Sequence, residues 1–180
     1  MSHYFGAVRQ LGYVVRNIEQ AMQHWSDVLG VGPWFYKEKV NTTEFRYYGK
    51  DSTPPALSIA LANSGGLQLE LIEQRDDAPS LYLDSLAKGG ESAQHIAYWT
   101  VHQYDEYVEK LLSKGYVEGH AGRMGANRGR FGYFLNPALP SGMIEISELT
   151  GGKAEYFENV KQVSSTWDGT DPVRAVAATR

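Results

Sequence analysis

The chain has 180 residues, close to the size of one ordinary domain, and 42% of them are hydrophobic, which is enough for a buried core and excludes a disordered chain. Its 17 basic and 21 acidic residues give a formal net charge of −4 without a long basic run, so nucleic acid or an anionic membrane surface is not expected as the main partner. Because cysteine is absent, disulfides and thiolate chemistry are excluded, and any metal must be held by imidazole, carboxylate or amide oxygen.

The first part of the chain predicts a βαβββ unit. A strand over residues 9–14 precedes a helix over 17–29, whose apolar residues recur at helical spacing and which Gly30 ends. Segments rich in aromatic and branched residues then predict strands over 34–40, 44–48 and 57–62, and a glycine-containing turn at 63–66 joins the last of these to a strand over 67–73.

The next part repeats this order. A helix over residues 78–88 is expected to connect the two units, and residues 94–99 then match residues 9–14, with His95 lying 85 residues after Gln10. A helix over 104–114 follows, and then strands over 116–119, 131–136 and 143–149, which are separated by loops at 122–129 and 137–142.

These elements predict one domain over residues 1–150 and an extension over 151–180. The domain comprises module one (6–75), a linker helix (76–91) and module two (92–150). The extension has no counterpart in either module, and its pattern indicates a helix near 155–163 and a tail. No apolar stretch approaches the ~20 residues that cross a bilayer, and residues 1–6 do not resemble a signal peptide, so a cytoplasmic location is expected.

Four polar residues occupy equivalent positions in the two modules. Side chains alternate between the faces of a strand, so Gln10 and His95 share a face with the small residues Gly12 and Ala97, respectively. In the closing strands, Glu70 and Glu145 lie opposite an apolar face.

A carboxylate in the middle of an apolar strand is costly to bury unless it is paired or bound to a metal. Each of the four residues taken alone fits a hydrogen-bonded core residue or a solvated carboxylate. Their equivalent positions together favour one site of amide oxygen, imidazole and two carboxylates. Such a set suits one divalent ion, namely Zn²⁺, Ni²⁺, Co²⁺, Fe²⁺ or Mn²⁺.

The repeat order and these positions resemble the vicinal oxygen chelate superfamily, which includes glyoxalase I, methylmalonyl-CoA epimerase, extradiol dioxygenases and bleomycin-resistance proteins. The resemblance covers about residues 6–150, and residues 25–32 also resemble the family's aromatic-x-x-x-Leu-Gly signature. It implies an α+β fold in which two tandem βαβββ modules form a cupped, barrel-like mixed sheet around one metal. It also implies the metal ligands Gln10, Glu70, His95 and Glu145, a set similar to that of eukaryotic-type glyoxalase I.

The family chemistry implies a metal-dependent isomerase, epimerase or lyase that moves a proton next to a carbonyl through an enolate. A small molecule with vicinal oxygens would be the substrate, Glu145 the base and Glu70 the partner acid. The glutathione contacts of glyoxalase I are not matched, because Val14, Gln74 and Glu91 occupy those positions. The substrate is therefore unassigned, and the chain is more similar to the epimerase branch.

Two other functions remain open at this stage. An extradiol-type dioxygenase would need a second imidazole where Gln10 stands, and a non-catalytic, antibiotic-binding protein would not need four metal ligands. Arg123, Arg128 and Arg130, in or next to the glycine-rich loop, could bind an anionic group of the substrate or could be solvated. The aromatic residues of the extension are expected to pack against a neighbouring half or subunit, and the protein is expected to be a homodimer, as relatives often are.

Overall fold

The strands of the protein form a single curved mixed sheet. The computed structural model describes residues 1–125 and 129–176, apart from the side chains of residues 139–141. Within these residues the sheet has eleven strands, in the order β11-β2-β5-β6-β1-β7-β10-β9-β8-β3-β4. The strands of the first half are β1 (Gln10–Val14), β2 (Trp34–Val40), β3 (Thr42–Tyr47), β4 (Lys50–Asp51), β5 (Leu57–Ser64) and β6 (Leu67–Gln74). The others are β7 (Ser92–Thr100), β8 (Val117–Met124), β9 (Arg130–Asn136), β10 (Leu139–Glu148) and β11 (Val173–Ala175).

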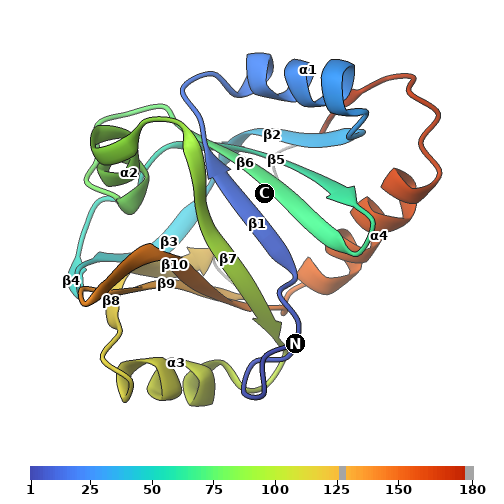
Figure 1. The fold of residues 1–180 in the computed structure, drawn as a ribbon. Coiled ribbons are helices and arrows are strands. Elements are labelled where there is room, and N and C mark those ends of the chain that lie inside the picture. The colour runs from blue at the N-terminus through green and yellow to red at the C-terminus, as the bar shows by residue number, and fades with distance from the viewer. Residues whose placement is uncertain (126–128, 177–180) are drawn as a thin grey trace.

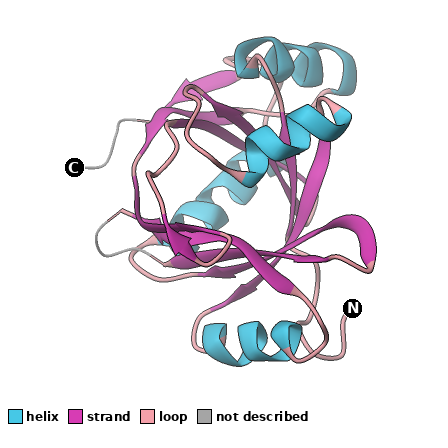
Figure 2. Ribbon diagram, turned by 90° about the vertical axis from the view of Figure 1, so that its left-hand side faces the viewer, coloured by secondary structure: helices cyan, strands magenta, loops and turns pink. Residues whose placement is uncertain are grey.

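The two modules join along their first strands. Strand β1 pairs in parallel with β6 inside module one, β7 pairs in parallel with β10 inside module two, and β1 pairs with β7 in the antiparallel direction. The sheet curves into a cup with these four strands in its middle (Figures 1 and 2). The predicted α+β class and cupped mixed sheet are confirmed.

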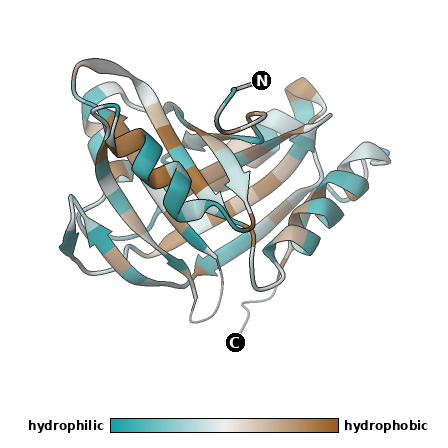
Figure 3. Ribbon diagram, turned by 90° about the horizontal axis from the view of Figure 1, so that it is seen from below, coloured by the Kyte–Doolittle hydropathy of each residue, from teal (hydrophilic) through white to brown (hydrophobic). Residues whose placement is uncertain are grey.

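Two helices cover the outside of the cup. Helix α1 (Ile18–Leu29) begins where the Asn17 side chain accepts the Gln20 N–H and ends at Gly30, whose left-handed backbone suits glycine. It buries Ile18 and Met22 against the outer face of module one, and α3 (Tyr104–Leu112) packs in the same way on module two (Figure 1). Hydrophilic and hydrophobic residues alternate along several strands, as expected where the two faces of a strand differ in burial (Figure 3).

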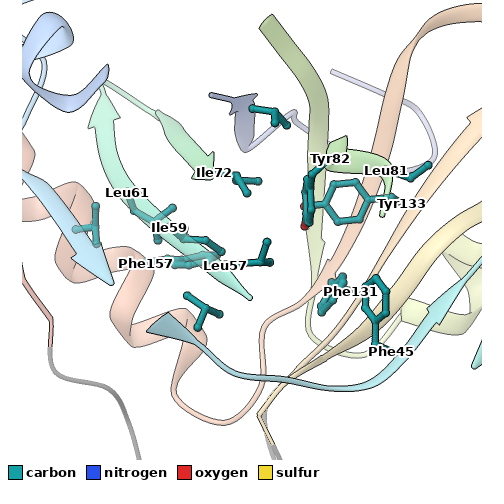
Figure 4. Close-up of a cluster of buried hydrophobic side chains, with 13 residues drawn as sticks. Phe45, Leu57, Ile59, Leu61, Ile72, Leu81, Tyr82, Phe131, Tyr133 and Phe157 are labelled. Carbon is teal, nitrogen blue, oxygen red and sulfur yellow. The ribbon is translucent and has the colours of Figure 1, made fainter. Parts of the chain in front are cut away.

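Two further helices flank the cup and contribute to its interior. Leu81 and Tyr82 of α2 (Leu81–Gly89) and Phe157 and Val160 of α4 (Lys153–Ser165) belong to one buried cluster with residues of both modules. In Figure 4, Phe157 lies beside Leu57 and Ile59, whereas Tyr82 lies beside Tyr133. The cup interior is therefore lined by apolar side chains from the sheet and from both flanking helices.

The structure differs from the predicted elements where the chain crosses between modules. Strand β3 leaves module one and pairs with β8 of module two, which sequence periodicity does not reveal. Strands β8 and β10 extend into the segments 122–129 and 137–142 that we predicted as loops, because each finds a partner strand there. The extension packs on module one of its own chain, where α4 contacts β5 and the unpredicted β11 pairs with β2.

No helix among the described residues is both long and apolar enough to cross a membrane.

Candidate metal centre and cavity

The pairing of the four central strands brings the predicted ligands together. Gly12 of β1 pairs with Glu70 on one side and His95 on the other. In the pseudo-symmetric position, Ala97 of β7 pairs with Gln10 and Glu145. The small residues thus lie between the polar ones, and all four candidate residues are at most 9% exposed.

Three of these residues form a tight cluster. His95 Nε2 lies 3.4 Å from Glu70 Oε2 and 3.3 Å from Glu145 Oε2, and one ligand atom from each of the three residues lies within 4.8 Å of the others. This arrangement could hold a divalent metal ion.

Glycine at position 12 makes room for the imidazole. A Cβ atom added to Gly12 would lie 1.9 Å from His95 Cε1 and 2.4 Å from Nε2, far inside van der Waals contact. The ring therefore lies directly over the Gly12 backbone. Any larger residue would move it.

A second set of polar groups fixes the orientation of the ligands. His95 Nδ1 lies 3.1 Å from Gln94 Oε1, and Gln94 Nε2 donates to Leu81 O and to Ser85 Oγ, both of which belong to α2. Because the Gln94 amide group donates to α2, its oxygen accepts from His95 Nδ1–H, so Nε2 is the nitrogen without a proton when the imidazole is neutral and can then bind a metal. This tautomer follows from the hydrogen-bond network. Sequence reasoning missed Gln94, since its role depends on where α2 lies.

Gln10 is oriented in a similar way. Its Nε2 donates to Gln68 Oε1 over 2.8 Å, so its own Oε1 remains available as a ligand oxygen. Gln10 lines the same cavity as Glu70 and Glu145.

The charges of His95, Glu70 and Glu145 affect one another's pKa values. Burial lowers the pKa of His95, but hydrogen bonds and charge interactions with Glu145 and Glu70 outweigh burial and raise it to about 9. Burial raises the pKa of Glu70. It opposes ionisation of Glu145 as well, yet His95, Lys153 and Ser147 hold the pKa of Glu145 below its ordinary value. The two carboxylates are therefore inequivalent although the backbone around them is nearly symmetric.

The donor set fits a divalent ion. His95 Nε2 is buried, and its contacts with the Glu70 and Glu145 oxygens, at 3.4 and 3.3 Å, are longer than ordinary hydrogen bonds, so a bound ion would satisfy this nitrogen better. Both carboxylate oxygens approach this same nitrogen. Imidazole and carboxylate together are typical ligands of Zn²⁺, Ni²⁺, Co²⁺, Fe²⁺ and Mn²⁺.

A cavity opens from the cluster into the cup. It has about 780 Å³ of empty space, including the part that is open to solvent. Its walls are mostly apolar, with contributions from β2, β5, β9 and α4 (Figure 4). Its polar lining consists of Gln10, Lys37, Thr42, Glu70, Tyr82, Tyr133, Glu145, Lys153 and Tyr156. An apolar cavity with a few convergent polar groups is typical of a small-molecule site.

Two tyrosines approach each other in this cavity. The hydroxyl oxygens of Tyr82 and Tyr133 lie 3.4 Å apart, and both side chains are 3% exposed. Burial raises both of their pKa values, so both hydroxyls keep their protons. They can donate hydrogen bonds to an oxygen atom of a bound molecule.

Two of the arginines that we predicted to bind substrate form ion pairs outside the cavity. Arg130 forms ion pairs with Glu148 and Asp105, and Arg123 pairs with Glu44. Neither lines the cavity. Arg128 lies outside the described residues.

One further histidine is buried close to the candidate metal centre. The side chain of His120 is fully buried. The rings of Phe45, Tyr82, Phe131 and Tyr133 surround it, and burial lowers its pKa to about 3. The structure therefore assigns it to the core as a neutral imidazole. His3, His24 and His102 are exposed.

Comparison with known proteins identifies the family. Residues 9–134 match the model of the Glyoxalase/Bleomycin resistance protein/Dioxygenase superfamily. Because this match spans most of the chain, the protein belongs to that superfamily. A comparison with curated protein sequences finds no match.

Solved structures share the fold at low sequence identity. Methylmalonyl-CoA epimerase from Mycobacterium tuberculosis is 18% identical, with a TM-score of 0.57 over 86% of this chain and 95% of the epimerase. Hypothetical protein BH1468 from Bacillus halodurans C-125 is 16% identical, with a TM-score of 0.55 over 81% and 95%. A variant of the Streptomyces coelicolor epimerase, in complex with 2-nitronate-propionyl-CoA, is 18% identical, with a TM-score of 0.53 over 80% and 94%.

Proposed function

We propose that this member of the superfamily is a metal-dependent isomerase or epimerase that moves a proton next to a carbonyl group of a small molecule with vicinal oxygens. The observation that carries the proposal is the position of Glu70 and Glu145, which flank His95 Nε2 at nearly equal distances where the apolar cavity begins. Two carboxylates placed in this way can remove a proton from one face of a carbon atom and return one to the other.

The metal would be held by Gln10 Oε1, Glu70, His95 Nε2 and Glu145. A bound divalent ion would act as a Lewis acid that lowers the pKa of a C–H bond next to a substrate carbonyl. Gln94 and Gln68 would keep His95 and Gln10 in their ligand orientations. The apolar walls would limit the access of water to the reacting carbon.

Glu145 would accept the proton and Glu70 would supply one. The pKa directions in the metal-free protein support these roles, because Glu145 loses its proton more readily than Glu70. Tyr82 and Tyr133 would donate hydrogen bonds to an oxygen of the substrate, where negative charge develops as the proton leaves.

Hydrogen exchange tests the proposal directly. Metal-loaded protein is incubated in deuterium oxide with acyl-CoA thioesters, α-hydroxyketones and the methylglyoxal–glutathione hemithioacetal, and deuterium at the carbon next to the carbonyl is measured by mass spectrometry. We expect metal-dependent exchange with at least one compound other than the hemithioacetal. In Glu145→Gln we expect exchange to fall by about 10²- to 10⁴-fold, the usual contribution of a general base.

Glu148→Gln is the matched control. Glu148 lies on the same strand, but it pairs with Arg130 and does not line the cavity, so its variant is expected to keep the wild-type exchange rate. Exchange that survives in Glu145→Gln would move the base to Glu70 or another group. A protein that binds these compounds without any exchange would instead be a binding protein, and oxygen uptake with catechols would indicate a dioxygenase.

A further inference from the structure

The C-terminal extension places a lysine inside the cavity. Lys153 is the first residue of α4, and its side chain lines the cavity together with Glu70 and Glu145. The helix reaches this position because α4 flanks the cup and packs on β5 (Figure 1). Farther along the same helix, Phe157 lies in the apolar wall (Figure 4).

The ammonium group of Lys153 is incompletely partnered. Lys153 Nζ donates to Ser147 Oγ over 2.6 Å and lies 5.4 Å from the centre of the Phe157 ring. Within residues 1–125 and 129–176, no carboxylate forms an ion pair with it. An ammonium group has three donors, so Lys153 retains the capacity to bind an anion in a mostly apolar cavity.

The position of Ser147 gives the approximate distance between this cation and the metal ligands. Ser147 follows Glu145 by two residues on β10, so both side chains lie on one face, about 7 Å apart along the strand. The ammonium group of Lys153, which donates to Ser147, therefore lies close enough to Glu145 for one small molecule to contact both residues.

The charge balance also favours an anion. A divalent ion held by Gln10, Glu70, His95 and Glu145 would bring those groups to a net charge of zero, since only the two glutamates carry charge. Lys153 then adds a positive charge to the cavity, which Lys37 also lines. In a cavity of low polarity this positive charge favours an anionic ligand.

We propose that Lys153 binds a carboxylate of the substrate, which makes the substrate a small organic acid with an apolar body and its carboxylate a few bonds from the reacting carbonyl. This inference rests on the proposed function, because the second anchor of the substrate is the metal. The extension outside the two modules then determines substrate class. Arg123 and Arg130 do not line this cavity.

Metal-chelating hydroxamates of matched charge test this inference. The monohydroxamates of malonic, succinic and glutaric acid each carry two vicinal oxygens and a free carboxylate, and their methyl esters lack only the charge. Dissociation constants for metal-loaded protein are measured by isothermal titration calorimetry. We expect at least one acid to bind about 10- to 100-fold more tightly than its ester, as a charged hydrogen bond implies.

In Lys153→Met the acid and its ester should bind equally, while the affinity for the ester and the metal content stay at wild-type values. Lys153→Arg should restore part of the preference, because it restores the charge. Lys161→Met is the matched control, since Lys161 lies on the same helix outside the cavity and pairs with Glu158. Thermal unfolding confirms that each variant is folded.

The outcomes separate the two proposals. Metal-loaded wild-type protein that binds every acid no better than its ester would overturn the role of Lys153 and leave the metal centre intact. The same conclusion follows if Lys153→Met keeps the preference, and loss of it in Lys37→Met would assign the carboxylate to that neighbouring lysine of the cavity. Wild-type protein that takes up no metal would overturn the proposed function and this inference together.

Discussion

Replacing Gly12 by alanine tests the geometry on which the metal centre depends. The added Cβ would lie 1.9 Å from His95 Cε1, 2.4 Å from Nε2 and 2.5 Å from Nδ1. Carbon atoms in contact are normally about 3.5–4.0 Å apart. The imidazole would therefore have to move by about 1.5–2 Å.

That displacement is large compared with what a metal ligand tolerates. Metal–nitrogen distances in such sites vary by only about 0.2 Å, and a displaced ring would also lose its contact with Gln94 Oε1. We expect the affinity for a divalent ion to fall by at least about 100-fold, more than the loss of an outer-shell partner alone. Overpacking of a buried position should lower the free energy of unfolding of the metal-free protein by about 1–3 kcal/mol.

Two measurements check this prediction. Metal content after dialysis is determined by mass spectrometry, and the free energy of unfolding is obtained from urea denaturation of metal-free protein. Gly66→Ala is the matched control, because a Cβ there would meet no atom within 4 Å. A Gly12→Ala protein that holds one ion with wild-type affinity would show that the imidazole does not bind the metal in the position described.

Two further predictions concern charge and assembly. The pKa of His95 is raised to about 9 in the folded, metal-free protein, above the unfolded value of about 6.5. Protonated His95 therefore stabilises the folded protein fully below pH 6.5, and this effect disappears as the pH rises through 9. The free energy of unfolding should fall by about 3 kcal/mol over this range. Urea denaturation of the metal-free protein at about pH 6.5 and 9.5 measures this loss, and a His95→Gln protein with the same pH dependence would contradict it. The homodimer stays a prediction, which light scattering tests: a mass near 20.1 kDa at micromolar concentration would refute it.

The internal repeat made the centre of the fold predictable. Alternation along the strands correctly assigned Glu70 and Glu145 to the face opposite Leu69, Leu71 and Ile146, because a period of two fixes which side chains share a face. The turn ending at Gly66 was identifiable for a similar reason, since two short runs of apolar residues flank it. These features depend on the spacing of residues along the chain, which can be read from the sequence.

Other features depended on contacts between distant segments. The pairing of β3 with β8, the burial of His120 and the orientation of His95 by Gln94 each join residues far apart in the chain or involve a helix placed by tertiary packing. No local pattern encodes such contacts, because a residue type is compatible with many partners.

The sequence by itself determined the two modules, the alternating faces and the candidate ligands Gln10, Glu70, His95 and Glu145. Only the tertiary structure decided what else lines the cavity. The tertiary structure places Lys153 in the cavity and Arg130 in a cluster of ion pairs. The sequence shows both only as basic residues close to strands. The physical reason is that the periodicity of a strand fixes the face of a side chain, whereas the packing of helix α4 on β5 fixes what lies opposite that face.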